Sequence, residues 1–231
     1  MILGTGIIGG AKPVLVYNDL LSDLGQNLTS VTVNSVPFGD EHSSRRVFAM
    51  IGVGMAEGSS ISGVTIGGVT ATQHVQAQAT GSPAQTLGIF SALVPTGTTG
   101  TIFWTRAGSG DMDGAGVFCL SSYYQRNAAA HDTASDVTGG SGSAVVDVNV
   151  KGGGFVLGLA KLSSSRVTTW SLSGSDAALS FLPEQDVSTD HQMAGLSGSQ
   201  LSAASPMAVR LSFSNSFGGP FKADCVAASF R

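Results

Sequence analysis

The chain has 231 residues, of which 42% are hydrophobic and only 11% charged, with a formal net charge of −4 and a pI near 5.4. The hydrophobic content excludes a disordered chain, and the acidic balance argues against a nucleic-acid-binding protein, which needs clustered Lys and Arg to neutralise phosphates. A polar but weakly charged surface favours a protein that packs against other subunits.

The first 28 residues differ from the rest of the chain, and we interpret residues 1–28 as an N-terminal arm or edge segment. A Gly-rich apolar start and Pro13 precede VLVYNDLLSDLGQN, which can form a short strand or a single helical turn. The large apolar side chains at the start show no strand or helix period, which favours docking on a partner over burial in the chain's own core. These side chains are Met1, Ile2, Leu3, Ile7 and Ile8.

The same start contains GTGIIG, Gly4 to Gly9, which matches the glycine spacing of a dinucleotide-binding turn. Such a site needs a strand before the first glycine and a helix after the last one, and neither fits here. We therefore expect no cofactor. The start also lacks the basic residues that open a signal peptide, and no apolar run reaches the roughly 18 residues that cross a bilayer, so we expect no membrane insertion and folding in a cytoplasm.

From residue 29 the chain reads as short alternating runs separated by Gly, Pro, Ser, Asn and Asp clusters, as antiparallel strands require. In VTIGGVTAT, Gly67-Gly68 lies between two β-branched runs and predicts a two-residue hairpin turn, because both central residues need positive φ. Residues 125–142 have no sustained period and predict a long surface loop. Alternating runs then resume up to the C-terminus.

These patterns predict an all-β protein: an antiparallel two-sheet sandwich of jelly-roll or immunoglobulin-like type, forming one domain over residues 29–231. Trp104 and Trp170 lie in strand-like runs, and we expect both in the core. Cys119 and Cys225 lie in apolar alternating runs and are most simply buried free thiols, with a disulfide between them as the alternative.

Nothing in the sequence selects a catalytic or metal site. The candidate general bases are His42, His74, His131 and His191, and no nucleophile elbow accompanies them. DMDG, Asp111 to Gly114, resembles the start of a calcium loop, but its twelfth position is Ser122 where a bidentate Glu is needed, so we interpret it as a turn. We expect a protein that is not an enzyme and holds no metal.

Two adjacent tyrosines suggest a different class of site. Tyr123 and Tyr124 follow a predicted strand, and a tyrosine face offers a sugar ring a large contact area at low entropic cost. Adjacent residues on a strand face opposite ways, so at most one of the two should be buried. Together with the loop at 125–142 they are candidate contacts for a host glycan.

Four stretches resemble small β-sandwich proteins and modules of tailed bacteriophages and prophages. They are SVPFGDEHSSRRVFAMIGVG, ISGVTIGGVTATQHVQA, GIFSALVPTGTTGTIFWTRAG and GAGVFCLSSY, and the likeness covers roughly Ser35 to Tyr124 in order and spacing. The shared motifs are turn and core residues, so the resemblance implies no catalytic residues. It implies a virion accessory piece, such as a decoration, fibre or tail-associated protein.

The leading hypothesis is therefore a non-enzymatic structural protein of a tailed-phage virion, assembled in the cytoplasm of the host bacterium. It would dock to capsid, tail or baseplate proteins through its N-terminal arm and one sandwich face, as a homo-oligomer with a trimer as the suggested state. The alternative is a carbohydrate- or receptor-binding module that recognises host-surface glycan through Tyr123 and Tyr124.

Overall fold

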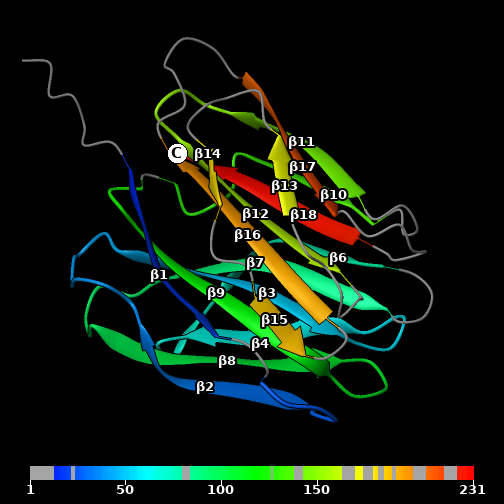
Figure 1. The fold of residues 1–231 in the computed structure, drawn as a ribbon. Helices are drawn as coiled ribbons and strands as arrows, with labels where there is room; N and C mark the ends of the chain where they lie inside the picture. Colours follow the sequence, from blue (N-terminus) through cyan, green and yellow to red (C-terminus); the bar gives the residue numbers. More distant parts are fainter. Residues whose placement is uncertain are drawn as a thin grey trace, which may run out of the picture.

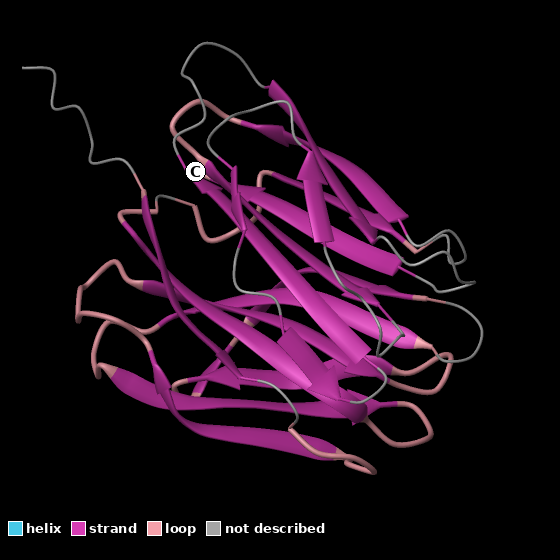
Figure 2. Cartoon of the chain, in the orientation of Figure 1, coloured by secondary structure: helices cyan, strands magenta, loops and turns pink. Residues whose placement is uncertain are grey.

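The computed structural model is built of antiparallel strands (Figures 1 and 2). Within the described residues every regular element is a strand, so the predicted all-β antiparallel sandwich is confirmed. The described residues are 13–21, 24–79, 84–125, 127–137, 143–162, 170–173, 179–181, 185–188, 191–199, 207–215 and 223–231.

The N-terminal half of the chain forms two sheets. The inner N sheet has the order β1 (Val14–Leu21), β9 (Asp113–Tyr123), β3 (Arg46–Gly54), β7 (Gln85–Leu93) and β6 (Thr72–Gln78). The outer N sheet has the order β2 (Ser30–Pro37), β8 (Thr99–Ala107), β4 (Ser60–Ile66) and β5 (Val69–Thr70). The predicted hairpin joins β4 to β5, with Gly67 at φ 59° and Gly68 at φ 76°, as the turn requires.

The C-terminal half forms a second pair of sheets. The inner C sheet has the order β10 (Asp132–Asp136), β18 (Ala223–Phe230), β12 (Phe155–Leu162), β16 (His191–Ser199) and β14 (Leu179–Phe181), with β15 (Gln185–Ser188) also paired to β16. The outer C sheet has the order β11 (Ser143–Val150), β17 (Met207–Asn215) and β13 (Trp170–Ser173). Figure 1 shows the four sheets as stacked layers, from β2 and β8 at the bottom to β11, β13 and β17 at the top.

The strand order of the N-terminal half is that of a jelly roll. The pairs β1·β9, β2·β8, β3·β7 and β4·β5 are the rungs of one long antiparallel hairpin that wraps around the core. Its strands consequently alternate between two sheets, β1-β9-β3-β7 and β2-β8-β4-β5. This order distinguishes the jelly roll from the immunoglobulin-like alternative.

The C-terminal half repeats this topology. The pairs β10·β18, β11·β17 and β12·β16 correspond to β1·β9, β2·β8 and β3·β7, and β13 pairs with β17 as β4 pairs with β8. Within the predicted domain of residues 29–231, the strands form two sheet pairs stacked back to back. Residues 14–21 of the predicted arm or edge segment form the edge strand β1, and residues 1–12 lie outside the described part.

Some residues at corresponding positions of the two halves are also identical. Cys119 on β9 lies opposite Ala49 on β3 and Asp19 on β1. In the second half, Cys225 on β18 lies opposite Ala160 on β12 and Asp136 on β10. Both cysteines are free and buried, so the prediction of buried free thiols is confirmed. Burial raises the pKa of each thiol to about 12, which keeps both protonated and unreactive.

Apolar cores lie between the described layers, and two of them hold most of the large buried side chains. The first joins the outer and inner N sheets and contains the predicted core residue Trp104, which is fully buried. The second joins the two inner sheets, where Phe48 on β3 meets Phe155 on β12 and Phe230 on β18 with ring centroids 5.7 Å and 4.9 Å away. Because the inner sheets share this core, the two halves form one packed body. The side chain of Trp170 lies outside the described residues.

The prediction of a continuous loop over residues 125–142 is wrong in one respect, because β10 lies inside it. The strand reads DTASD and has no apolar alternation that would mark it in the sequence. Its carboxylates accept main-chain hydrogen bonds from β11, with Asp136 Oδ2 2.9 Å from Val145 N and Asp132 Oδ2 2.7 Å from Asn149 N. The acidic side chains therefore have a structural role at this edge.

Candidate functional site: an aromatic cluster at the end of β9

Tyr123 and Tyr124 lie where β9 ends, at one end of the N-terminal half. Tyr123 is the last residue of the strand and is partly buried, whereas Tyr124 is 42% exposed and adopts a φ of 63°. Positive φ is uncommon for a bulky residue and persists only where the surroundings hold it. The turn at Tyr124 thus points an aromatic ring outward at a fixed position.

A histidine completes the cluster, and the sequence analysis did not connect it with the tyrosines. The ring of His42 lies edge-on to both, with ring centroids 5.9 Å from Tyr123 and 4.7 Å from Tyr124. Edge-to-face geometry at these separations is a favourable aromatic contact. We call these three residues the aromatic triad. His42 is about 80 positions from the tyrosines in sequence, and only the pairing of β3 with β9 brings its loop beside them.

Ser44 ties two members of the triad together. Its hydroxyl oxygen accepts the main-chain N–H of Tyr124 at 3.0 Å and lies 2.8 Å from Nδ1 of His42. Its own main-chain N–H donates to the same Nδ1 at 3.1 Å, so the proton of the neutral ring is on Nε2. These bonds fix both the position of Tyr124 and the orientation of the imidazole.

Tyr123 anchors the cluster rather than presenting it. Its hydroxyl donates to the main-chain oxygen of Asp40 at 3.1 Å. Gly39, at φ 75°, makes room for that hydroxyl, because a Cβ at this position would lie 2.7 Å from the Tyr123 oxygen. A glycine is therefore needed here for two reasons, the backbone conformation and the close approach.

Arg45 supports the loops beneath the triad. Its side chain is fully buried and donates to five main-chain oxygens, those of Gly39, Asp40, Val94, Thr96 and Gly97, at 2.6–2.9 Å. A guanidinium has five N–H donors, so this set uses its full capacity. Arg45 thereby joins the loop before β3 to the loop after β7. The sequence signal was the Arg45-Arg46 pair, which alone does not distinguish a buried scaffold from a surface charge.

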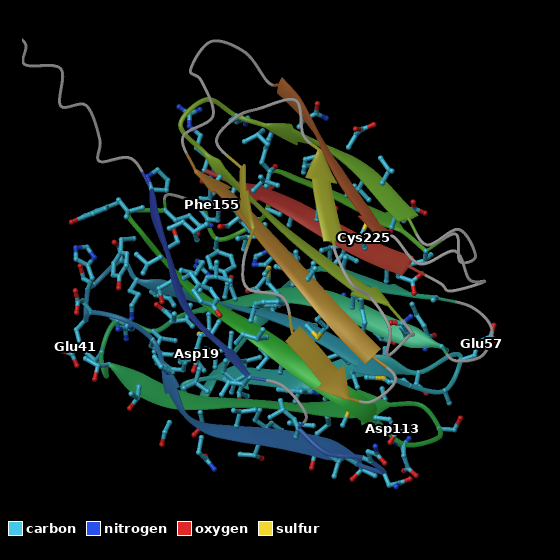
Figure 3. The ribbon with its side chains drawn as sticks, in the orientation of Figure 1. Asp19, Glu41, Glu57, Asp113, Phe155 and Cys225 are labelled. Carbon is cyan, nitrogen blue, oxygen red and sulfur yellow. The ribbon has the colours of Figure 1, made fainter. Side chains whose placement is uncertain are left out.

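The other histidines named in the sequence analysis lie apart from the triad. His74 on β6 is largely buried against Phe230, with ring centroids 4.8 Å apart, and burial lowers its pKa to about 4. Of the carboxylates, Glu41 precedes His42 and accepts the main-chain N–H of Gly97 at 2.6 Å, whereas Glu57 and Asp113 lie at the opposite end of the N-terminal half (Figure 3). His131 lies just before β10, and the side chain of His191 lies outside the described residues. Among the described side chains, no three metal-ligating groups gather.

The predicted arm contacts Met1, Ile2, Leu3, Ile7 and Ile8 also lie outside the described residues. In the described part of the chain there is no helix long and apolar enough to span a membrane. A scan against protein-family models, a search of curated proteins and a search of solved structures each return no match.

The triad presents an aromatic face that is suited to surface recognition. Tyr124 presents a flat apolar face beside the imidazole of His42, and the main-chain atoms below are already engaged through Ser44 and Arg45. A rigid aromatic face of this kind can stack on the apolar face of a sugar ring or on a partner's side chain with little loss of side-chain entropy.

Proposed function

We propose that this protein is a non-enzymatic structural component of a tailed-phage virion. It docks to capsid, tail or baseplate proteins through residues 1–12 and a face of the sandwich, after folding in the host cytoplasm. The main support is the pair of jelly rolls that share one apolar core, since jelly rolls are a common building unit of viral shells. This support is an analogy of fold, and the sequence resemblance over residues 35–124 adds to it.

The experiment is to replace the intact gene in its own genome with one that lacks residues 2–10. We expect the truncated protein to fold with a thermal midpoint close to that of the full chain, while its amount in purified particles falls sharply. A truncated chain that unfolds places the segment in its own subunit's core, and normal incorporation removes the docking role. Absence of the full-length protein from purified particles contradicts the virion proposal itself.

The second candidate function is recognition of a host-surface glycan, and the aromatic triad favours it. Tyr124 is the proposed contact because it is exposed, whereas Tyr123 is a positioning residue because its hydroxyl is held by Asp40. Both functions can coexist in one particle, since lectin domains also use jelly rolls.

A glycan array on the purified protein tests this second function. We expect binding that Tyr124→Ala abolishes and that Tyr17→Ala, a matched change at a tyrosine 36% exposed on β1, leaves unchanged. No binding to any bacterial surface glycan, or equal loss in both variants, contradicts a specific site at the triad.

A further inference from the structure

β1 is an edge strand of the inner N sheet. This strand has eight residues and, among the described strands, pairs only with β9. An unpaired strand edge presents a row of main-chain donors and acceptors, which forms a template for another strand. Folded proteins usually protect such edges with charges, prolines, irregularities or covering segments.

From Val14 to Tyr17, β1 contains no charge, no proline and no irregularity in its pairing with β9. Val14 is 47% exposed and Val16 is 39% exposed, and no charged residue lies between Val14 and Asn18. The first acid, Asp19, follows an irregularity in the pairing with β9 between Tyr17 and Asp19. The exposed edge is therefore apolar, uncharged and regular over the length of a short strand.

Three other edge strands of the N-terminal half differ from β1. β5 has only two residues, and β2 has an irregular register between Val33 and Val36, a positive φ at Ser35 and a proline at its end. β6 packs against β10 and β18.

The second half has a charged strand at the position of β1. There β10 and β11 occupy the positions of β1 and β2, and β10 carries Asp132 and Asp136 at its two ends. Their carboxylates accept the main-chain N–H groups of Asn149 and Val145, so these bonds cap β11 rather than the edge of β10. β1 has no charged residue from Val14 to Asn18, and this contrast in charge distinguishes its edge from that of β10.

We infer that β1 pairs in antiparallel fashion with β1 of a second copy of this chain, so that two inner N sheets become one continuous sheet. A two-fold axis at Val16 places Val14 opposite Asn18 and Leu15 opposite Tyr17, so no like charges face each other. Asp19 then falls opposite Pro13, outside the paired segment. One strand edge is sufficient for this dimer, because a two-fold interface uses the same surface on both copies.

The inference goes beyond the proposed function and does not depend on it, because it rests on the strand edge alone.

Sedimentation velocity of the full chain over a concentration series tests the inference. We expect a dimer, twice the 23.3 kDa mass of the chain, at micromolar concentrations. Val16→Lys should shift the protein to monomer by at least tenfold in dissociation constant, because a lysine on the edge opposes its own copy across the axis. Val69→Lys, a matched change at a valine 42% exposed on β5, should leave the dimer intact.

A cross-linking measurement keeps the test decisive if Val16→Lys does not fold. In Val16→Cys the two thiols face each other across the axis, within the Cα separation that a disulfide accepts for either kind of antiparallel pair. Oxidised glutathione should then produce a covalent dimer, and Val69→Cys should not. A monomeric wild type, an oligomer unaffected by folded Val16→Lys, or no cross-link at Val16→Cys overturns the inference.

Discussion

The buried guanidinium of Arg45 is the residue on which the candidate site most depends. Each of its N–H groups satisfies a main-chain oxygen of two loops, from inside the fold, because the guanidinium itself is fully buried. Leaving such acceptors without a donor costs about 1–3 kcal/mol for each group that stays buried. Arg45 therefore stabilises the loops more through the oxygens it satisfies than through its charge.

We predict that Arg45→Met lowers the free energy of unfolding by about 2–4 kcal/mol, because the main-chain oxygens that stay buried lose their donor at about 1–3 kcal/mol each. Urea titration followed by tryptophan fluorescence measures this. Arg46→Met is the matched control, because Arg46 is half-buried and donates to Ser91 Oγ at 3.2 Å, and we expect a loss of about 1 kcal/mol. Equal losses in the two variants contradict the role assigned to Arg45.

Lys161 is the second residue with an unusual environment. Its side chain is fully buried between the two inner sheets, and Nζ donates to the main-chain oxygen of Gly114 at 2.8 Å. Burial lowers its pKa to about 7, against a smaller opposite effect of Asp113. Between pH 7 and the ordinary value of 10.5, the unfolded chain holds a proton that the folded chain has released. Stability therefore rises with pH through this window and does not change further below it.

We predict that Lys161→Met removes this rise and stabilises the protein at pH 7 by a few kcal/mol, about 2–4, because an apolar side chain replaces a poorly solvated amine. Thermal unfolding at several pH values from 6 to 10.5 measures the difference between variant and wild type. Lys151→Met, at a partly exposed lysine just before the turn that leads into β12, should leave the pH profile unchanged. A wild type and a Lys161→Met variant with parallel profiles would contradict the prediction.

At the scale of the elements, a close approach between β3 and the inner C sheet fixes how the two halves pack. Gly52 on β3 lies opposite Gly116 on β9, and a Cβ at position 52 would lie 2.9 Å from Met193 Sδ and 3.3 Å from Lys161 Cδ. The missing side chains let the sheets approach at the place where Lys161 enters the interface. This glycine is needed for space, not for a special φ.

We predict that Gly52→Val lowers the free energy of unfolding by about 1–3 kcal/mol through overpacking. The same substitution should cost less in a Met193→Ala background, because the truncated side chain leaves room for the valine. A double-mutant cycle by urea denaturation measures the coupling between positions 52 and 193. Additive effects would show that the two residues do not compete for space.

The strands themselves were largely predictable from the sequence, and the number of layers was not. Outer strands such as β2 alternate buried and exposed residues, which is the pattern of a sheet with one solvated face. β3 is buried almost throughout, because each inner sheet has a core on both faces. The unbroken apolar run VFAMIGV was the signal for that double burial, and alternation alone does not detect it.

The candidate site was predictable only in part. The adjacent tyrosines mark the end of β9, but His42, Ser44 and Arg45 join them through long-range pairing, which local patterns do not contain. The repeated topology of the two halves could not be seen in the sequence for a similar reason. Its shared residues, Cys, Ala and Asp, are adjacent across strands and far apart in sequence.

At the scale of the whole molecule, the core between the inner sheets makes each half depend on the other. The inner N sheet contributes Phe48, Met50, Leu87, Ile89, Phe118 and Leu120 to it. Without the second half these side chains would face water, and each forgoes about 1.5–3 kcal/mol of burial free energy. An isolated first half would therefore carry a large apolar sheet face, although its own jelly roll is topologically complete.

We predict that residues 1–125 expressed alone aggregate or bind a hydrophobic dye strongly, and that co-expression with residues 126–231 restores a soluble complex of the two. Light scattering and dye fluorescence measure the first effect, and co-purification measures the second. The control is the full chain with a protease site inserted at residue 126, which should stay associated and soluble after cleavage, because the shared core rather than the peptide link holds the halves together. If residues 1–125 alone are monomeric and as heat-stable as the full chain, the halves are independent domains. The apolar face of the inner N sheet would then not need the inner C sheet to keep it from water.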